Sequence, residues 1–225
     1  MAKSEIKFRL LNEITQPTER DRQRRVGPSS LGNPCPHCLG REMYMTDHDV
    51  DGGFNDDFSM FPWIGTAVHA YLERQVFQTP DFLHEQKLWV GDVPLYGPIK
   101  GTADLVHKEA TSAFGTFVGD WKIVGLKKIK AYIANGAPKQ YRYQAQLYAR
   151  GCELAGMPVD FIAIIFIPRD SGNPNDIYVH EEAYQPEMAE AALARAGEIY
   201  KVVLSDGYEN LPSDPDCWVC NYRSW

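Results

Sequence analysis

The sequence contains no apolar run long enough to span a membrane, and its first residues, MAKSEIKFRL, lack the apolar stretch of a secretion signal. It also lacks the string GxxxxGK[ST], so we expect no built-in ATP-driven motor. These absences predict a cytoplasmic chain with no membrane partner. What remains is 225 residues, of which 44% are hydrophobic and 24% charged, and this composition is typical of a single globular domain over 1–225.

Cysteine is scarce, with five residues, but four of them form two CxxC pairs. Cys35 and Cys38 lie in NPCPHCLG, and Cys217 and Cys220 lie in DPDCWVCNY. A chain without a secretion signal does not favour disulfides. We expect each pair to lie on a tight turn, where four thiolates can converge on a tetrahedral metal ion or an iron-sulfur cube. Cys152 falls within a helical pattern and is expected to be a buried, inert thiol.

The net charge of -7 argues against a general polyanion binder. One stretch departs from this balance, because residues 122–144 contain six basic side chains and no acid. The six are Lys122, Lys127, Lys128, Lys130, Lys139 and Arg142. Such a basic strip is either a solvated face or a nucleic-acid-binding surface.

Hydrophobic periodicity predicts helices over 61–77, 138–156 and 186–207. It predicts strands over 83–90, 94–107, 115–124, 159–168 and 176–184. The run VDFIAIIFIP at 159–168 lacks polar alternation, so we expect it to be fully buried. The segment 46–58 does not match the spacing of an EF-hand and is predicted to be a loop, and TERDRQRR at 18–25 an exposed arm.

Two opposite charges interrupt the apolar strand at 115–124. Residues i and i+2 of a strand point to one side, so Asp120 and Lys122 lie together. Taken alone, the two are either a structural ion pair or an acid beside a catalytic ammonium. Likewise, His69 is either a half-buried histidine or a metal ligand, and Asp104 either caps a turn or joins Asp120 in binding a divalent cation.

Four short strings occur in a fixed order: GTAVHAYLE, GTADLV, GDWK and QAQLY. Together they resemble the RecB-type branch of the PD-(D/E)XK nuclease superfamily, over about residues 61–150. The resemblance implies an α/β fold with a restriction-endonuclease-like core, a mixed central β-sheet flanked by helices, at about 61–206. It implies magnesium or manganese bound by His69, Asp104 and Asp120. The catalytic residues that it implies are Asp104, Asp120, Lys122, Gln144 and Tyr148.

Other residues are assigned around this core. Glu85, in the preceding strand, is considered as an outer carboxylate. The side chains expected to contact nucleic acid are Lys127, Lys128, Lys130, Lys139 and Arg142.

The cysteines extend the resemblance to the iron-sulfur RecB-like nucleases, which include the AddB nuclease domain and the CRISPR-associated RecB-like nucleases. Those place one cysteine before the core and three after it, whereas this chain has two on each side. The resemblance implies a 4Fe-4S cluster, and four thiolates also suit zinc. The cysteines that would hold it are Cys35, Cys38, Cys217 and Cys220. Segments 27–45 and 212–225 would then form a clasp around the core.

The resemblance implies a metal-dependent DNA exonuclease that acts on single-stranded DNA or DNA ends in recombination, repair or replication. A separate helicase or recombination protein would be its partner. Two alternatives remain open: a non-catalytic, zinc-stapled nucleic-acid-binding module, and a structure-specific endonuclease on the same fold.

Overall fold

The computed structural model describes residues 6–7, 9, 26–49, 60–110 and 115–222. Its helices are α3 (Pro28–Leu31), α4 (Pro36–Asp47), α5 (Met60–Gln75), α6 (Leu126–Asn135), α7 (Lys139–Leu154), α8 (Pro186–Asp206) and α9 (Trp218–Tyr222). Its strands are β1 (Phe82–Val93), β2 (Gly97–His107), β3 (Phe117–Val124), β4 (Phe161–Pro168) and β5 (Tyr178–Ala183). Single 3-10 turns lie at Pro174–Asp176 and Tyr208–Asn210.

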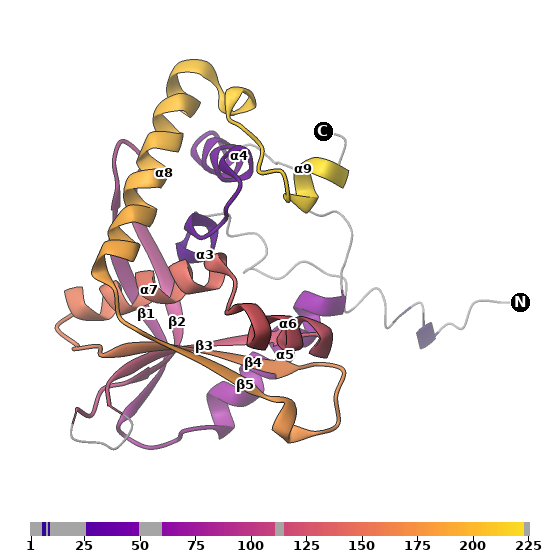
Figure 1. Ribbon diagram of the computed structural model, residues 1–225. Coiled ribbons are helices and arrows are strands. Elements are labelled where there is room, and N and C mark those ends of the chain that lie inside the picture. The colour runs from indigo at the N-terminus through magenta and orange to yellow at the C-terminus, as the bar shows by residue number, and fades with distance from the viewer. Residues whose placement is uncertain (1–5, 8, 10–25, 50–59, 111–114, 223–225) are drawn as a thin grey trace, which may run out of the picture.

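The strands form one mixed sheet in the order β1-β2-β3-β4-β5 (Figure 1). Neighbours are antiparallel except β3 and β4, which are parallel and therefore need a long crossover connection. Helices α6 and α7 provide it. The α/β class and the mixed sheet flanked by helices confirm the fold predicted from the sequence.

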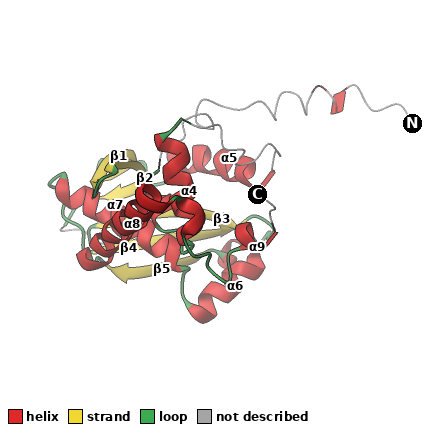
Figure 2. Cartoon of the chain, turned by 90° about the horizontal axis from the view of Figure 1, so that it is seen from above, coloured by secondary structure: helices red, strands yellow, loops and turns green. Residues whose placement is uncertain are grey.

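The two faces of the sheet are covered unequally. Seen from above in Figure 2, α4, α7 and α8 lie over the strands. The larger core lies on this side and contains Val118 and Val124 of β3 with Leu147 of α7. The opposite face carries a smaller core, in which Leu72 of α5 packs near Phe117 and Trp121. No helix among the described residues has the length and apolarity that crossing a membrane requires.

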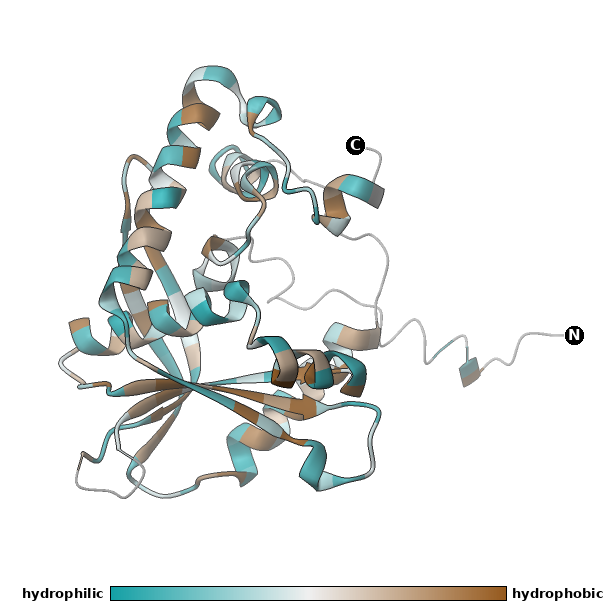
Figure 3. Cartoon of the chain, in the orientation of Figure 1, coloured by the Kyte–Doolittle hydropathy of each residue, from teal (hydrophilic) through white to brown (hydrophobic). Residues whose placement is uncertain are grey.

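The prediction for β4 was wrong for one of its faces. Figure 3 colours this strand mostly brown, for hydrophobic residues, yet several of its apolar side chains are only partly buried. Ile162, Ile164 and Phe166 face the larger core at 0% exposure. Phe161, Ile165 and Ile167 are only partly buried, because the face to which they point is incompletely covered.

Several helices were not predicted. Helix α6 follows β3 directly and was not predicted, although Leu126, Ile129 and Ile133 recur at helical spacing and Ile129 is fully buried. Helix α4 extends to Asp47, into the segment predicted to be a loop, of which residues 50–58 lie outside the described residues. The predicted arm at 18–25 also lies outside them.

Candidate active site and cysteine centre

The candidate site lies where β2 and β3 diverge. Their ladder has three pairs, from His107↔Phe117 to Leu105↔Gly119. The next positions in this register are Asp104 and Asp120, where the ladder stops. There Oδ2 of Asp104 accepts a hydrogen bond of 2.8 Å from the backbone N–H of Trp121. The carboxylate thus takes the place of a main-chain acceptor in the ladder. The point where β2 and β3 separate, called the fork below, therefore carries two acids on adjacent strands.

Asp120 is the most deeply buried charged group of the site. Nζ of Lys122 lies 2.6 Å from its Oδ2, and Nε2 of Gln144 on α7 donates to its Oδ1 at 3.1 Å. The ammonium of Lys122 thus contacts one carboxylate oxygen of Asp120, and the amide of Gln144 donates to the other. Burial and the charge of Asp104 raise the pKa of Asp120 to about 6, against the lowering effect of Lys122.

Helix α7 contributes one face to the site. Burial and the negative charge of Asp120 raise the pKa of Tyr148 above its ordinary value, so this phenol keeps its proton. Tyr141, which the sequence analysis missed, places its ring centroid 5.1 Å from Nζ of Lys122. Tyr141 precedes Gln144 by three residues, and this i, i+3 spacing is the signal that could have revealed it.

His69 reaches the same fork from α5 on the other side of the sheet. Its Nδ1 lies 3.6 Å from Oδ1 of Asp104. Burial alone would lower the pKa of His69, but the contact with Asp104 and the charges of both acids raise it overall. Histidine, the two acids and the lysine therefore meet at one place, although they come from α5, β2 and β3.

The donor atoms of the site are those that a hard divalent cation prefers. Their separation is larger than a bound cation requires. Carboxylate oxygens are the ligands of magnesium, and manganese also accepts imidazole. The buried carboxylate of Asp120 already contacts the ammonium of Lys122, so it would share its oxygens between Lys122 and such a cation. However, among the described residues only the four cysteines have ligand atoms all within 4.8 Å of one another, so His69, Asp104 and Asp120 would have to close around an ion.

Glu85 lies next to Asp104 in the sheet. On β1 it falls between the pairs His84↔Leu105 and Gln86↔Ala103. Its φ of 48° is in the left-handed region, which is costly for a residue with a side chain. A strained backbone beside the fork is compatible with the outer carboxylate considered from the sequence, which stays a prediction.

The basic strip divides into two groups. Lys127, Lys128 and Lys130 are exposed on α6, immediately after β3. Lys139 is exposed at the start of α7, with its Nζ 5.2 Å from the ring centroid of Tyr143. Arg142 instead turns toward β5, where its Nε lies 2.5 Å from Oε2 of Glu182. Its charge is therefore already paired, unlike the exposed ammonium groups of α6.

The four paired cysteines converge although they lie at distant positions in the chain. The Sγ atoms of Cys38 and Cys217 are 3.5 Å apart, as are those of Cys38 and Cys220, and Cys35 lies 3.6 Å from Cys220. The pairs occupy helix starts rather than the predicted tight turns, because Cys35 caps α4 and Cys217 directly precedes α9. Cys152 is buried in the larger core, as expected.

The chemistry of these thiols fits a metal centre. With a metal–sulfur bond of 2.3 Å, a tetrahedral site has sulfur–sulfur edges of about 3.8 Å, close to the separations found. Burial and the neighbouring thiols raise the pKa of Cys38 far above its ordinary value. Four adjacent thiolates need a compensating cation, and a metal ion or cluster supplies it.

The chain resembles two solved structures. No protein-family model matches the sequence, and no curated protein matches it. SSO0001 superposes with a TM-score of 0.55 at 17% identity, covering 96% of this chain and 89% of its own. LHK-Exo, solved in complex with dAMP, gives a TM-score of 0.57 at 14% identity, covering 84% of this chain and 91% of its own. At these identities the two structures show that the fold is shared.

Proposed function

We propose that this chain is a divalent-metal-dependent deoxyribonuclease of RecB type. The observation that carries the proposal is the fork between β2 and β3, where the buried carboxylate of Asp120 meets Lys122, Gln144 and the carboxylate of Asp104. A buried acid with a raised pKa beside a lysine is costly to stability and typical of a functional site. The shared fold with LHK-Exo, which was solved with a nucleotide, supports the same reading.

Each residue has a role in this proposal. His69, Asp104 and Asp120 would hold magnesium or manganese, which when bound polarises a phosphoryl oxygen and acidifies water. Lys122 neutralises charge that develops on the phosphate in the transition state. Gln144 orients the carboxylate of Asp120 through its 3.1 Å hydrogen bond. Tyr148, kept protonated by its raised pKa, serves as a hydrogen-bond donor.

The substrate that we propose is single-stranded DNA or DNA ends. The exposed lysines of α6 follow β3 directly, so a phosphate backbone bound along α6 leads to Lys122. The sequence lacks a motor motif, so we propose that strands of duplex DNA are separated by another protein, a helicase or recombination factor.

A cleavage assay tests this function. We expect the chain to degrade linear DNA only with magnesium or manganese, and to spare circular single-stranded DNA, which has no ends. Lys122→Met should lower the rate by roughly a hundredfold or more, because the charge near the phosphate is lost. The matched control is Lys201→Met on α8, an exposed lysine that pairs with Glu198.

Other results would select another function. Unchanged cleavage by Lys122→Met would show that the site is wrongly assigned. DNA binding without any cleavage would favour the non-catalytic, zinc-stapled module. Cleavage of the circular substrate would favour an endonuclease.

We also propose that Cys35, Cys38, Cys217 and Cys220 hold a structural metal centre. The sulfur separations fit one tetrahedral ion, and a cube of four irons, in which each sulfur binds a different iron, would require the sulfurs to move apart. Elemental analysis of anaerobically purified protein distinguishes the two. Zinc without colour identifies the single ion, whereas iron with acid-labile sulfide and visible absorption identifies the cluster. A protein that contains neither, yet is equally stable, would contradict the proposal.

A further inference from the structure

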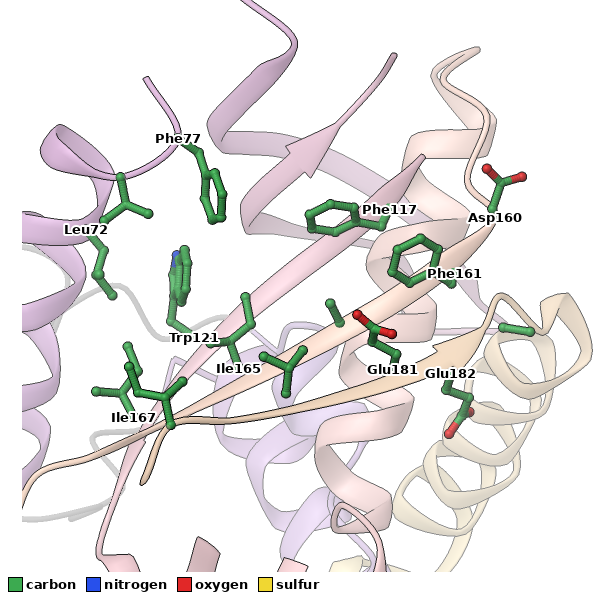
Figure 4. A pocket seen from close by; sticks show the side chains of 15 residues that line it. Leu72, Phe77, Phe117, Trp121, Asp160, Phe161, Ile165, Ile167, Glu181 and Glu182 are labelled. Carbon is green, nitrogen blue, oxygen red and sulfur yellow. The ribbon is translucent and has the colours of Figure 1, made fainter. Parts of the chain in front are cut away.

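An open apolar cleft lies on the sheet face opposite α7 and α8. It has a volume of about 910 Å³, and its lining includes Phe117, Trp121, Ile165 and Val179 from three strands. In Figure 4, Leu72 and Phe77 stand along one side of it, facing Trp121. Acidic side chains, among them Glu181, line the other side. Helix α5 is thus one wall of the cleft.

The sequence of β4 is suited to burial on both faces. Within the described residues, only the face toward α7 and α8 is fully covered. FIAIIFI is a continuous apolar run, the pattern of a strand between two layers. The described residues bury one set of side chains completely and leave Phe161, Ile165 and Ile167 only partly covered. On the neighbouring strand, Val179 is 43% exposed, and Ile177, just before it, is 45% exposed. An apolar surface of this extent on one face is typical of an interaction site.

The outer side of α5 is apolar as well. Its inner side packs Val68, Leu72 and Val76 against the sheet. The solvent side carries an outer ridge of exposed residues at helical spacing: Met60, Trp63, Ala67 and Tyr71, followed by Arg74. A helix that is apolar on both sides is normally buried on both sides. The ridge therefore lacks a cover within the described part of the chain.

We propose that the cleft and the outer ridge together form the interface of a two-fold symmetric dimer of this chain. In a two-fold pair, the ridge of each copy faces the cleft of the other, so one interface covers both apolar surfaces. Charge agrees with this pairing, because Arg74 ends the ridge and Glu181 lines the cleft.

The available area is sufficient for a dimer. Six large apolar side chains of the two surfaces are between 39% and 62% exposed: Met60, Trp63, Tyr71, Phe77, Ile177 and Val179. With roughly 150–200 Å² for each whole side chain, they would bury about 500 Å² per copy and about 1,000 Å² in the pair. A specific interface buries at least about 1,000 Å², so the six side chains alone reach this minimum, which agrees with a dimer that dissociates on dilution.

Sedimentation velocity over a wide range of concentrations tests the dimer. We expect the full chain to form a dimer that dissociates on dilution. Trp63→Glu on the ridge and Val179→Glu in the cleft should each weaken association by roughly a hundredfold or more, because each buries an unpaired charge. Both positions are exposed in one copy, so both variants should match the unfolding temperature of the wild type at concentrations where the wild type is monomeric. The matched control is Lys201→Glu on α8, away from the cleft.

Mixing the two variants makes the test specific for ridge-to-cleft pairing. A mixed pair retains one contact in which both surfaces are native, so mixing should recover part of the association that each variant has lost. Three results would overturn the proposal: a wild-type monomer at all concentrations, variants that dimerise as tightly as wild type, or mixing that recovers nothing.

Discussion

The replacement Asp120→Asn is expected to change the pH dependence of stability in a direction opposite to that of an ordinary salt bridge. A carboxylate stabilised by its lysine would have a lowered pKa and would stabilise the fold above it. Asp120 differs, because its burial outweighs the contact with Lys122 and raises its pKa to about 6. Its ionisation therefore opposes folding in the absence of a bound cation.

The magnitude follows from the two pKa values. Below pH 3.8 the carboxyl group is protonated in both the folded and the unfolded chain and has no effect. Between 3.8 and about 6 only the unfolded chain ionises, so wild-type stability falls as the pH rises. Above both values the loss is complete, at about 3 kcal/mol. The variant has no such loss, so its free energy of unfolding should gain about 3 kcal/mol relative to wild type between pH 3 and pH 7.

Urea unfolding of both proteins in buffer free of divalent cations, across this pH range, measures the difference. The cysteine centre is common to both proteins, so its contribution cancels. Added magnesium should stabilise only the wild type, because a cation favours the ionised carboxylate. A difference that stays constant with pH, or that falls as the pH rises, would show that Lys122 dominates over burial and refute the reasoning.

Three further predictions concern other parts of the fold. Gly32→Ala should lower the free energy of unfolding by about 1–3 kcal/mol in thermal unfolding, because its Cβ would lie within 3 Å of a backbone oxygen of α7. The control is Gly172→Ala, whose Cβ would lie in open space and should leave stability unchanged. Glu182→Gln should cost about 1–2 kcal/mol at pH 7. Burial alone would raise the pKa of Glu182, but its hydrogen-bond donors, Arg142 first, lower it. The cost should therefore shrink as the pH falls below the unfolded-state pKa and vanish as it falls through the lower folded-state pKa, and a constant cost would contradict this. Lys127→Ala should flatten the salt dependence of DNA binding, and an unchanged slope would make α6 a merely solvated face.

The sequence predicted the elements whose burial is one-sided and periodic. Alternation in β3 placed Asp120 and Lys122 on one side, and the 2.6 Å contact shows them together. Helical spacing placed Gln144 on α7, where it reaches Asp120. These predictions succeed because side-chain direction in a regular element depends only on local backbone geometry.

The sequence did not predict features that arise from tertiary packing. The divergence of β2 and β3 depends on the backbone N–H of Trp121 bonding Asp104, and no side-chain pattern encodes a backbone donor. The partial exposure of β4 was not predicted for a similar reason. An apolar run shows which side chains a strand is able to bury, but not whether the rest of the chain packs against them. The pairing of Arg142 with Glu182 depends on a strand forty residues away.

The separation of the two cysteine pairs has a consequence for the order of events during protein synthesis. Cys38 and Cys217 are 179 positions apart, and all five strands lie between them. A growing chain can therefore pair its strands while only half of the sulfur ligands exist. Metal capture becomes one of the last steps of maturation, so the loaded centre marks chains in which the whole sheet has already been made.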